Sequence, residues 1–151
     1  MGVTVRAAQA ADRAVIKRLL GAFMDYLEAI EPGEAAADLD ALVDQAFGPD
    51  PVCATLIAER EGEPIGYAGY HLGVWEIYRA IYVVSLFVLP EARGTGAGFA
   101  LMDAAKAIAR ERGAKRIVWE VWKKNPPAIA FYEKIGGTVS EENLRMSLVV
   151  E

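Results

Sequence analysis

Three glycines in one short loop are the residues whose type and spacing point most directly to chemistry. Gly94, Gly96 and Gly98 follow an apolar run at residues 81–89 and precede a helical pattern that ends at Gly113. A buried strand that leads through glycines into a helix aims free backbone N–H groups at one point, and the helix dipole favours negative charge there. We therefore predict an anion-binding site at this loop.

Two nucleotide-binding loops and one structural turn produce a similar local pattern. A Walker loop needs Lys followed by Ser or Thr after its last glycine, whereas Phe99 and Ala100 follow here. A dinucleotide-binding fingerprint needs a small residue at position 99 or 101, where this chain has Phe99 and Leu101. Both nucleotide loops are therefore excluded. A glycine turn that only lets a helix lie close to a strand stays open on this pattern alone.

A second motif follows one strand later and extends the first. Asn125 precedes Phe131-Tyr132-Glu-Lys-Ile-Gly136, and the glycine loop itself begins with Arg93. An Arg-x-x-Gly-x-Gly loop followed by Asn and Phe-Tyr-x-x-x-Gly at this spacing resembles the GNAT acetyltransferase superfamily. The resemblance implies an acetyl-CoA-dependent N-acetyltransferase whose loop N–H groups hold the pyrophosphate of acetyl-CoA.

The resemblance also assigns residues to the cofactor and to catalysis. The implied cofactor-binding residues are Phe87, Val88, Arg93, Gly94, Thr95, Gly96, Ala97, Gly98 and Asn125. In the family, backbone N–H groups near Phe87 and Val88 contact the thioester and pantetheine where the central strand separates from its neighbour. Tyr132, with a reference pKa near 10, can protonate a thiolate of reference pKa about 8.5, so it is the predicted catalytic acid. Without the resemblance, Tyr132 would be a core tyrosine packed beside Phe131, and Asn125 could equally be only a helix cap.

Further stretches resemble diamine acetyltransferases of the spermidine/spermine type, among them residues 39–48 and 66–75. That subgroup carries acids where this chain has Val84, Ser85 and Lys123. We expect direct acetyl transfer to a primary amine of a diamine-like or amino-acid-like small molecule. The resemblance and position mark five substrate-side residues: Tyr26, Glu28, Trp75, Glu76 and Ser85.

Two other functions are compatible with the same motifs. One is an acetyltransferase that acts on a protein N-terminus or lysine, and the other is a non-catalytic, CoA-binding regulatory module. The acidic turn at residues 28–34 favours a closed pocket for a cationic amine over an open peptide groove. A module without activity would be expected to have lost some of the motif residues, and they are intact.

The base that accepts the proton of the amine is not visible from spacing. An alkyl amine has a pKa near 10.4, so an acceptor is needed at neutral pH. Four carboxylates are candidates, although a solvated surface position is the simpler interpretation of each: Glu28, Glu31, Glu76 and Glu120. The single histidine, His71, has no partner motif and is expected to be structural or incidental, and Cys53 to be a small core residue.

The elements around these residues alternate between strand and helix patterns. Strands are predicted at residues 3–6, 52–59, 65–72, 77–89, 115–122 and 144–150, with an interruption at 73–76. Helices are predicted after a cap at Asp12, at residues 39–47, after the glycine loop, and from Asn125 to Gly136. The run at 77–89 is apolar enough for a central position. The expected fold is α/β (α+β), with a mixed, mostly antiparallel sheet of six to seven strands flanked by about four helices, as the resemblance implies.

Composition bounds the remaining possibilities. A chain of 151 residues, 54% of them hydrophobic, suits one acetyltransferase domain over residues 1–151. A net charge of −5 argues against nucleic acid as the main partner. One cysteine allows no internal disulfide and no cysteine pair for zinc, so we expect a cytoplasmic protein without a metal. We expect no signal peptide and no membrane partner. The resemblance implies a homodimer.

Overall fold

The structure is a computed structural model that describes residues 2–33 and 38–150. Contacts within the chain separate two compact units, one that ends at Glu120 and one that begins at Val121. The first unit contains the sheet, three α-helices and the glycine loop, and the second contains the helix α4 and the C-terminal segment. Within the described ranges, no helix is both long and apolar enough to cross a membrane.

The sheet has five strands in the order β1-β2-β3-β4-β5. Their bounds are Val3–Ala7 (β1), Ala54–Arg60 (β2), Glu63–Trp75 (β3), Tyr78–Val88 (β4) and Arg116–Trp119 (β5). All neighbours are antiparallel except β4 and β5, which are parallel. The predicted mixed, mostly antiparallel class is therefore confirmed, with fewer strands than the six or seven expected.

One predicted strand is absent among the described residues. The alternating tail at residues 144–150 forms no strand in the part of the chain that the structure describes, and side chains such as Leu144 are 90% exposed there. Alternation specifies which side chains share a face, but a strand also needs a paired edge. The apolar strand β4 is internal, as predicted: it lies between β3 and the short edge strand β5.

The predicted interruption at residues 73–76 is also absent, because β3 continues to Trp75. Trp75 pairs with Tyr78, so β3 and β4 form one long hairpin with Glu76 and Ile77 in its turn. Glu76 adopts a positive φ of 54° there. Continuous pairing with β4 offsets the weak strand preference of Gly73, which a single sequence cannot show.

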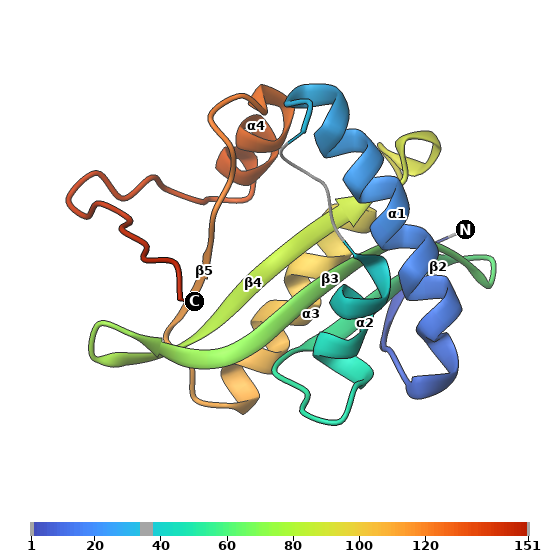
Figure 1. Cartoon of the computed structure of the whole chain (residues 1–151), viewed down its shortest axis with the longest axis horizontal. Helices are drawn as coiled ribbons and strands as arrows, with labels where there is room; N and C mark the ends of the chain where they lie inside the picture. Colours follow the sequence, from blue (N-terminus) through green and yellow to red (C-terminus); the bar gives the residue numbers. More distant parts are fainter. Residues whose placement is uncertain (1, 34–37, 151) are drawn as a thin grey trace. The chain divides into compact units, whose positions relative to one another are not determined.

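The helices α1 (Arg13–Ile30), α2 (Leu39–Phe47) and α3 (Ala97–Glu111) cover the two faces of the sheet. Figure 1 shows α1 and α2 on one face and α3 on the other. Alternate residues of one strand divide between two cores: Ile57 packs with the α1 and α2 side, and Leu56 packs with the α3 side. The same division places Tyr67 on the α1 face and Ala68 on the α3 face. The face on which a strand residue lies therefore determines which helices its side chain can contact.

Candidate active site

The glycine loop joins β4 to α3 through a short 3-10 turn, η2 (Pro90–Ala92). Gly94 and Gly96 have φ angles of 79° and 89°, a left-handed conformation that other residues avoid. A Cβ atom at either position would meet no atom within 4 Å, so conformation rather than crowding explains both glycines. Gly96 is the N-cap of α3, and Ala100 N donates to Gly96 O at 2.9 Å. Helix geometry leaves the N–H groups before Ala100 without an intrahelical acceptor.

Two side chains brace this loop. The Thr95 hydroxyl donates to Ala92 O at 2.6 Å, which fixes the turn that precedes α3. Arg93 Nε donates to Val88 O at 3.3 Å. The Arg93 guanidinium lies 4.8 Å from the ring centroid of Tyr26 and 5.7 Å from that of Phe87. The Arg93 charge is therefore directed at two aromatic rings in this structure.

Beyond Val83, the edge of β4 that faces β5 carries no strand pairing among the described residues, and we call it the open edge. Pairing between the two strands ends at Val83 and Trp119, whereas β4 continues to Val88. Leu89 N donates to Ile65 O at 2.9 Å, and bonded pairs alternate with non-bonded pairs along an antiparallel ladder.

Successive backbone N–H groups of β4 therefore point in opposite directions. The register directs the N–H of Phe87 towards Tyr67 on β3, and the N–H groups of Leu86 and Val88 towards the open edge. The N–H groups near Phe87 and Val88 were both predicted from the sequence to be unpaired here; that of Val88 faces the open edge, whereas that of Phe87 faces β3. Leu86 was missed, because the ladder phase depends on the register between strands.

A β-bulge lies where β4 leaves β5. Gly69 pairs with Ser85 but Tyr70 pairs with Val83, so Val84 is the extra residue. A bulge bends its strand and changes which face the next side chain occupies. Ser85 therefore shares the α1 face with Tyr82, although the two are three positions apart.

Ser85, a predicted substrate residue, lies in a crowded part of the α1 face. A Cβ atom at Gly69 would come within 3.2 Å of Ser85 Oγ. The neighbouring Tyr67 hydroxyl is buried without an atom in hydrogen-bond geometry. Burial raises the pKa of Tyr67, while an interaction with Ser85 lowers it by less. We regard that interaction as weak, because the two hydroxyls do not meet in hydrogen-bond geometry. Ser85 therefore lies beside Gly69 and Tyr67 on the α1 face.

A polar cluster follows on the same face. The Tyr82 hydroxyl donates to Glu120 Oε1 at 2.6 Å. The ring of Tyr82 stacks on the imidazole of His71, its partner across the strands, with centroids 5.3 Å apart and planes 3° from parallel. His71 Nδ1 is 3.4 Å from Leu72 O. Sequence reasoning missed Tyr82, because only cross-strand pairing reveals its partners.

The remaining predicted substrate residues lie in different places. Tyr26 is on α1 against Phe87, with ring centroids 5.8 Å apart. Glu28 Oε1 accepts a hydrogen bond from Gly33 N at 2.8 Å, which gives this carboxylate a role at the end of α1. Glu34, the last residue of the predicted acidic turn, lies outside the described residues.

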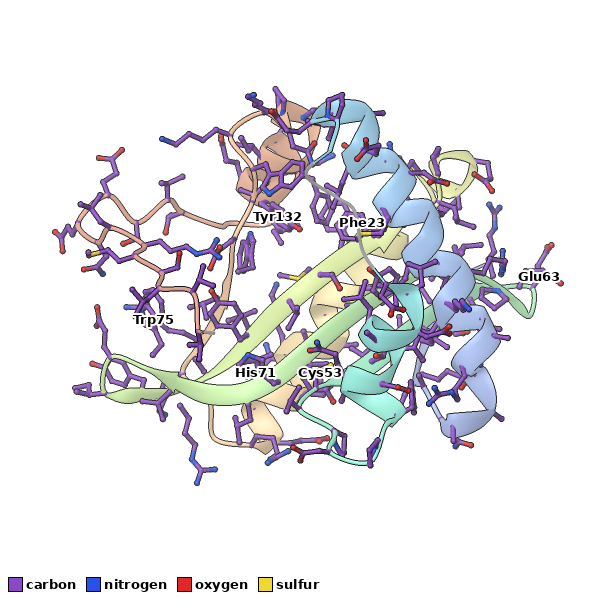
Figure 2. All side chains as sticks on the ribbon, viewed as in Figure 1. Phe23, Cys53, Glu63, His71, Trp75 and Tyr132 are labelled. Atoms are coloured by element: carbon purple, nitrogen blue, oxygen red, sulfur yellow. The ribbon has the colours of Figure 1, made fainter. Side chains whose placement is uncertain are left out.

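Trp75 and Glu76 are not brought to the glycine loop. Trp75 lies at the tip of the β3–β4 hairpin (Figure 2), and Glu76 follows it in the turn. The strand from Tyr78 to Val88 separates the tip from the loop by roughly 30 Å at about 3.3 Å per residue. Within this unit they therefore belong to a different region from Tyr26 and Ser85.

The second unit holds the other two predicted residues. Asn125 is the N-cap of α4 (Pro126–Lys134), and its side chain accepts from Ala128 N at 3.4 Å. It is 7% exposed, so it is buried as well as capping. Tyr132 lies on α4 with its ring 5.4 Å from that of Phe131, and Gly137 N donates to Tyr132 O at 2.8 Å.

Comparison with known proteins gives one consistent result. The family described as Acetyltransferase (GNAT) matches residues 16–137. An uncharacterized N-acetyltransferase of Bacillus subtilis (strain 168), YhfO, is 32% identical over 137 residues, or 89% of each protein. A thialysine N-epsilon-acetyltransferase of Bos taurus is 28% identical over 144 residues, or 89% of this chain and 83% of that protein.

A solved structure agrees with the fold. The ribosomal-protein-alanine N-acetyltransferase from Brucella melitensis biovar Abortus 2308 has a TM-score of 0.78 at 20% identity, over 98% of this chain and 100% of that one. The matched residues include the glycine loop, Asn125 and Tyr132. The chain therefore belongs to the GNAT acetyltransferase family and is an acetyl-CoA-dependent N-acetyltransferase.

Proposed function

We propose that this enzyme transfers acetyl from acetyl-CoA directly to the primary amine of a small molecule, diamine-like or amino-acid-like. One observation carries the proposal: the open edge of β4 leads without a break into a left-handed glycine loop that begins α3. The open edge presents the backbone N–H groups of Leu86 and Val88, and the glycine loop that follows β4 presents the N–H groups that would bind an anion. A thioester on a long amide-containing arm with a pyrophosphate matches that sequence of groups.

The residues present fit acetyl-CoA. The N–H groups at the start of α3, from Ala97 onwards, would hold the pyrophosphate, because a helix N-terminus stabilises negative charge. The N–H groups of Leu86 and Val88 would bind the amide-containing arm and polarise the thioester carbonyl. Bound acetyl-CoA supplies an activated acyl carbon and a thiolate leaving group.

Tyr132 is the proposed proton donor to the departing thiolate, and Asn125 a proposed contact of the cofactor arm. Both roles follow from the family motif that these residues match. A tyrosine of reference pKa near 10 is close enough in acidity to a thiol of about 8.5 to protonate the departing thiolate, and it regains a proton from the cationic nitrogen that the attack of the amine forms.

The acceptor is the less constrained half of the reaction. The similarity to a protein named as acting on thialysine supports a small amine. Tyr26 and Ser85, on the α1 face, are the proposed acceptor contacts, and Glu28 borders them on α1. The subgroup acids are replaced here by Val84 and Ser85, which favours an acceptor other than a long polyamine. We also propose a homodimer, and no nucleic-acid or membrane partner.

A protein N-terminus or lysine is the alternative acceptor. The structure that resembles this chain and acts on ribosomal-protein alanine shares 20% identity, a level that indicates the fold alone. A non-catalytic, CoA-binding role is the second alternative, and intact motif residues argue against it.

Acetyl-CoA turnover, followed by free thiol release, tests the proposal. The panel contains diamines, amino acids, aminoglycosides and N-terminal peptides, each at several concentrations. We expect thiol release with one class of small amines and none above background with peptides. Faster release with peptides would favour the protein acceptor. CoA binding without release in any reaction would favour the regulatory module.

A further inference from the structure

We propose that Tyr67 is a positioning residue that directs the Ser85 hydroxyl towards an oxygen atom of the acceptor, so that the enzyme selects amines that also carry a hydroxyl or a carboxylate. The inference rests on the proposed acetyl transfer, in which Ser85 is an acceptor contact, and it narrows the class of acceptor. The shared chemistry of that class is an oxygen lone pair at a fixed distance from the reacting amine. The second ammonium group of a diamine has no lone pair.

The Tyr67 hydroxyl is the first observation. Tyr67 is 2% exposed, and among the described residues its hydroxyl is a buried side-chain atom without a hydrogen-bond partner. The ring lies among apolar side chains, because Phe23 and Phe87 belong to the same core and the ring centroid of Phe23 is 6.3 Å from that of Tyr67. A buried hydroxyl without a partner is costly, since it bonds to water in the unfolded chain. Such groups are uncommon in folded proteins, and a role in recognition accounts for this one.

The strand register brings Ser85 towards this hydroxyl. Ser85 pairs with Gly69 on β3, which lies two positions from Tyr67 and therefore on the same face. Gly69 has no side chain to separate the two residues, and a Cβ atom there would come within 3.2 Å of Ser85 Oγ. The bulge at Val84 places Ser85 on this face. Of the described side chains, Ser85 is the one that acts on the Tyr67 hydroxyl.

The number of protons on the two hydroxyls sets the direction of their hydrogen bonds. Each hydroxyl has one proton, so the pair forms one bond between its members and leaves one proton for an atom outside. Tyr67 is buried and Ser85 is partly exposed, so we infer that Tyr67 donates to Ser85 Oγ when an acceptor is bound and that Ser85 donates outwards. In solvent, water accepts this outward proton. An acceptor molecule that displaces the water must offer an oxygen lone pair, because otherwise one proton stays unbonded.

Other polar groups on the α1 face agree with an oxygen-bearing acceptor. The Tyr82 hydroxyl donates to Glu120 Oε1 at 2.6 Å, so this tyrosine, unlike Tyr67, has an acceptor within the protein. The Arg93 guanidinium lies 5.7 Å from the ring centroid of Phe87 and forms no ion pair with a described residue. Its charge disfavours a second ammonium on the acceptor and favours a carboxylate.

The test compares four acceptors of one chain length, which is the length that gives the fastest thiol release in the panel. They are an alkylamine and the amino alcohol, amino carboxylate and diamine that carry their second group at the same distance. The measured quantity is kcat/KM for each acceptor relative to that for the alkylamine, which we call the preference. We expect the wild-type enzyme to prefer the amino alcohol or the amino carboxylate to both other amines. The comparison of these two distinguishes a hydroxyl from a carboxylate as the group that Ser85 binds.

Two variants and their combination test the hydrogen-bonded chain. Ser85→Ala and Tyr67→Phe should each lower the preference for the better oxygen-bearing acceptor about three- to tenfold, the effect of one neutral hydrogen bond. Because Tyr67 acts through Ser85, adding Tyr67→Phe to Ser85→Ala should lower the preference no further. Tyr70→Phe is the matched control: it makes the same change on β3 but on the α3 face, and it should keep the wild-type preference.

Urea unfolding separates this role from a structural one. Tyr67→Phe removes a buried hydroxyl that has no partner and keeps the ring, so the free energy of unfolding should stay the same or rise. A fall would show that the hydroxyl is bonded within the fold, and the assignment of Tyr67 would be abandoned.

The kinetic outcomes separate the two proposals. An unchanged preference in Ser85→Ala or in Tyr67→Phe, with thiol release intact, would overturn this inference and leave the acetyl transfer standing. A wild-type preference for the diamine would do the same. Additive losses in the double variant would remove Tyr67 as a positioning residue. No thiol release by the wild-type enzyme with any amine would overturn the proposed function, and this inference with it.

Discussion

Replacement of Gly96 by alanine tests how the glycine loop binds its anion. Gly96 has a φ of 89° at the N-cap of α3, and an added Cβ would meet nothing within 4 Å. The change therefore introduces conformational strain without a clash. A left-handed conformation costs about 1–2 kcal/mol for a residue with a Cβ atom.

Gly113 offers a matched control at the other end of the same helix. Its φ is 69°, and a Cβ there would also meet nothing within 4 Å. Gly113→Ala should therefore lower the free energy of unfolding by a similar 1–2 kcal/mol. It should leave CoA binding unchanged, because it is removed from the N–H groups that begin α3.

The two variants should differ in CoA affinity. Alanine at position 96 relieves its strain by rotating out of the left-handed region, which re-aims the N–H groups of Ala97 and its neighbours. A hydrogen bond to a charged group contributes about 1.5–3 kcal/mol. Loss of one such bond weakens CoA binding about 10- to 100-fold, since 1.4 kcal/mol is a factor of ten.

Calorimetric titration with CoA and urea unfolding of both variants provide the measurements. We expect similar unfolding midpoints for Gly96→Ala and Gly113→Ala, and weakened CoA binding in Gly96→Ala alone. If the two variants bound CoA equally well, the pyrophosphate would not depend on this loop conformation, and the reasoning would be refuted.

Three further predictions concern catalysis, packing and acid stability. Tyr132→Phe should lower turnover by about 100-fold or more in the thiol-release assay and leave the calorimetric CoA affinity unchanged; equal turnover would remove Tyr132 as the acid. Gly66→Ala should lower the free energy of unfolding in urea by about 1–3 kcal/mol, because the new Cβ would lie 2.7 Å from Phe87 O, and an unchanged midpoint would contradict this crowding. Hydrogen bonds from Arg6 and from Gln9 N lower the pKa of Asp12 to about 2, below its ordinary 3.8, so its stabilisation is present above about pH 4 and lost as pH falls through 2. Arg6→Ala should therefore cost up to about 1 kcal/mol at pH 7 and less at pH 2 in urea unfolding, and a pH-independent cost would argue against the pair.

Local patterns were sufficient for most elements of the fold. The apolar spacing at residues 39–47 predicted α2, and Asn125 followed by two prolines predicted the start of α4. Such signals lie within one or two turns, so no distant contact is needed to interpret them. Asp12 shows the limit: it precedes α1 as predicted, but its carboxylate accepts from Arg6 and Gln9 N instead of capping that helix.

The sequence by itself indicated the family and predicted the anion site. The spacing of Arg93, Gly96 and Gly98 and the later Asn125 and Tyr132 are properties of short segments, and a positive φ at a glycine is a local requirement. The acceptor side has no comparable local signal.

Tertiary structure alone decided which residues surround the opening between β4 and β5. The ladder phase that directs Leu86 N–H outwards and the bulge at Val84 depend on the register between β3 and β4. The bond between Tyr82 and Glu120 joins residues 38 positions apart. Register is set by the packing of whole faces, and a shift of one residue would turn Tyr82 and Ser85 to the other side of the sheet. For this reason the cofactor-binding residues could be predicted from short segments of the sequence, whereas the surroundings of Tyr82 and Ser85 became visible only once the strands were paired.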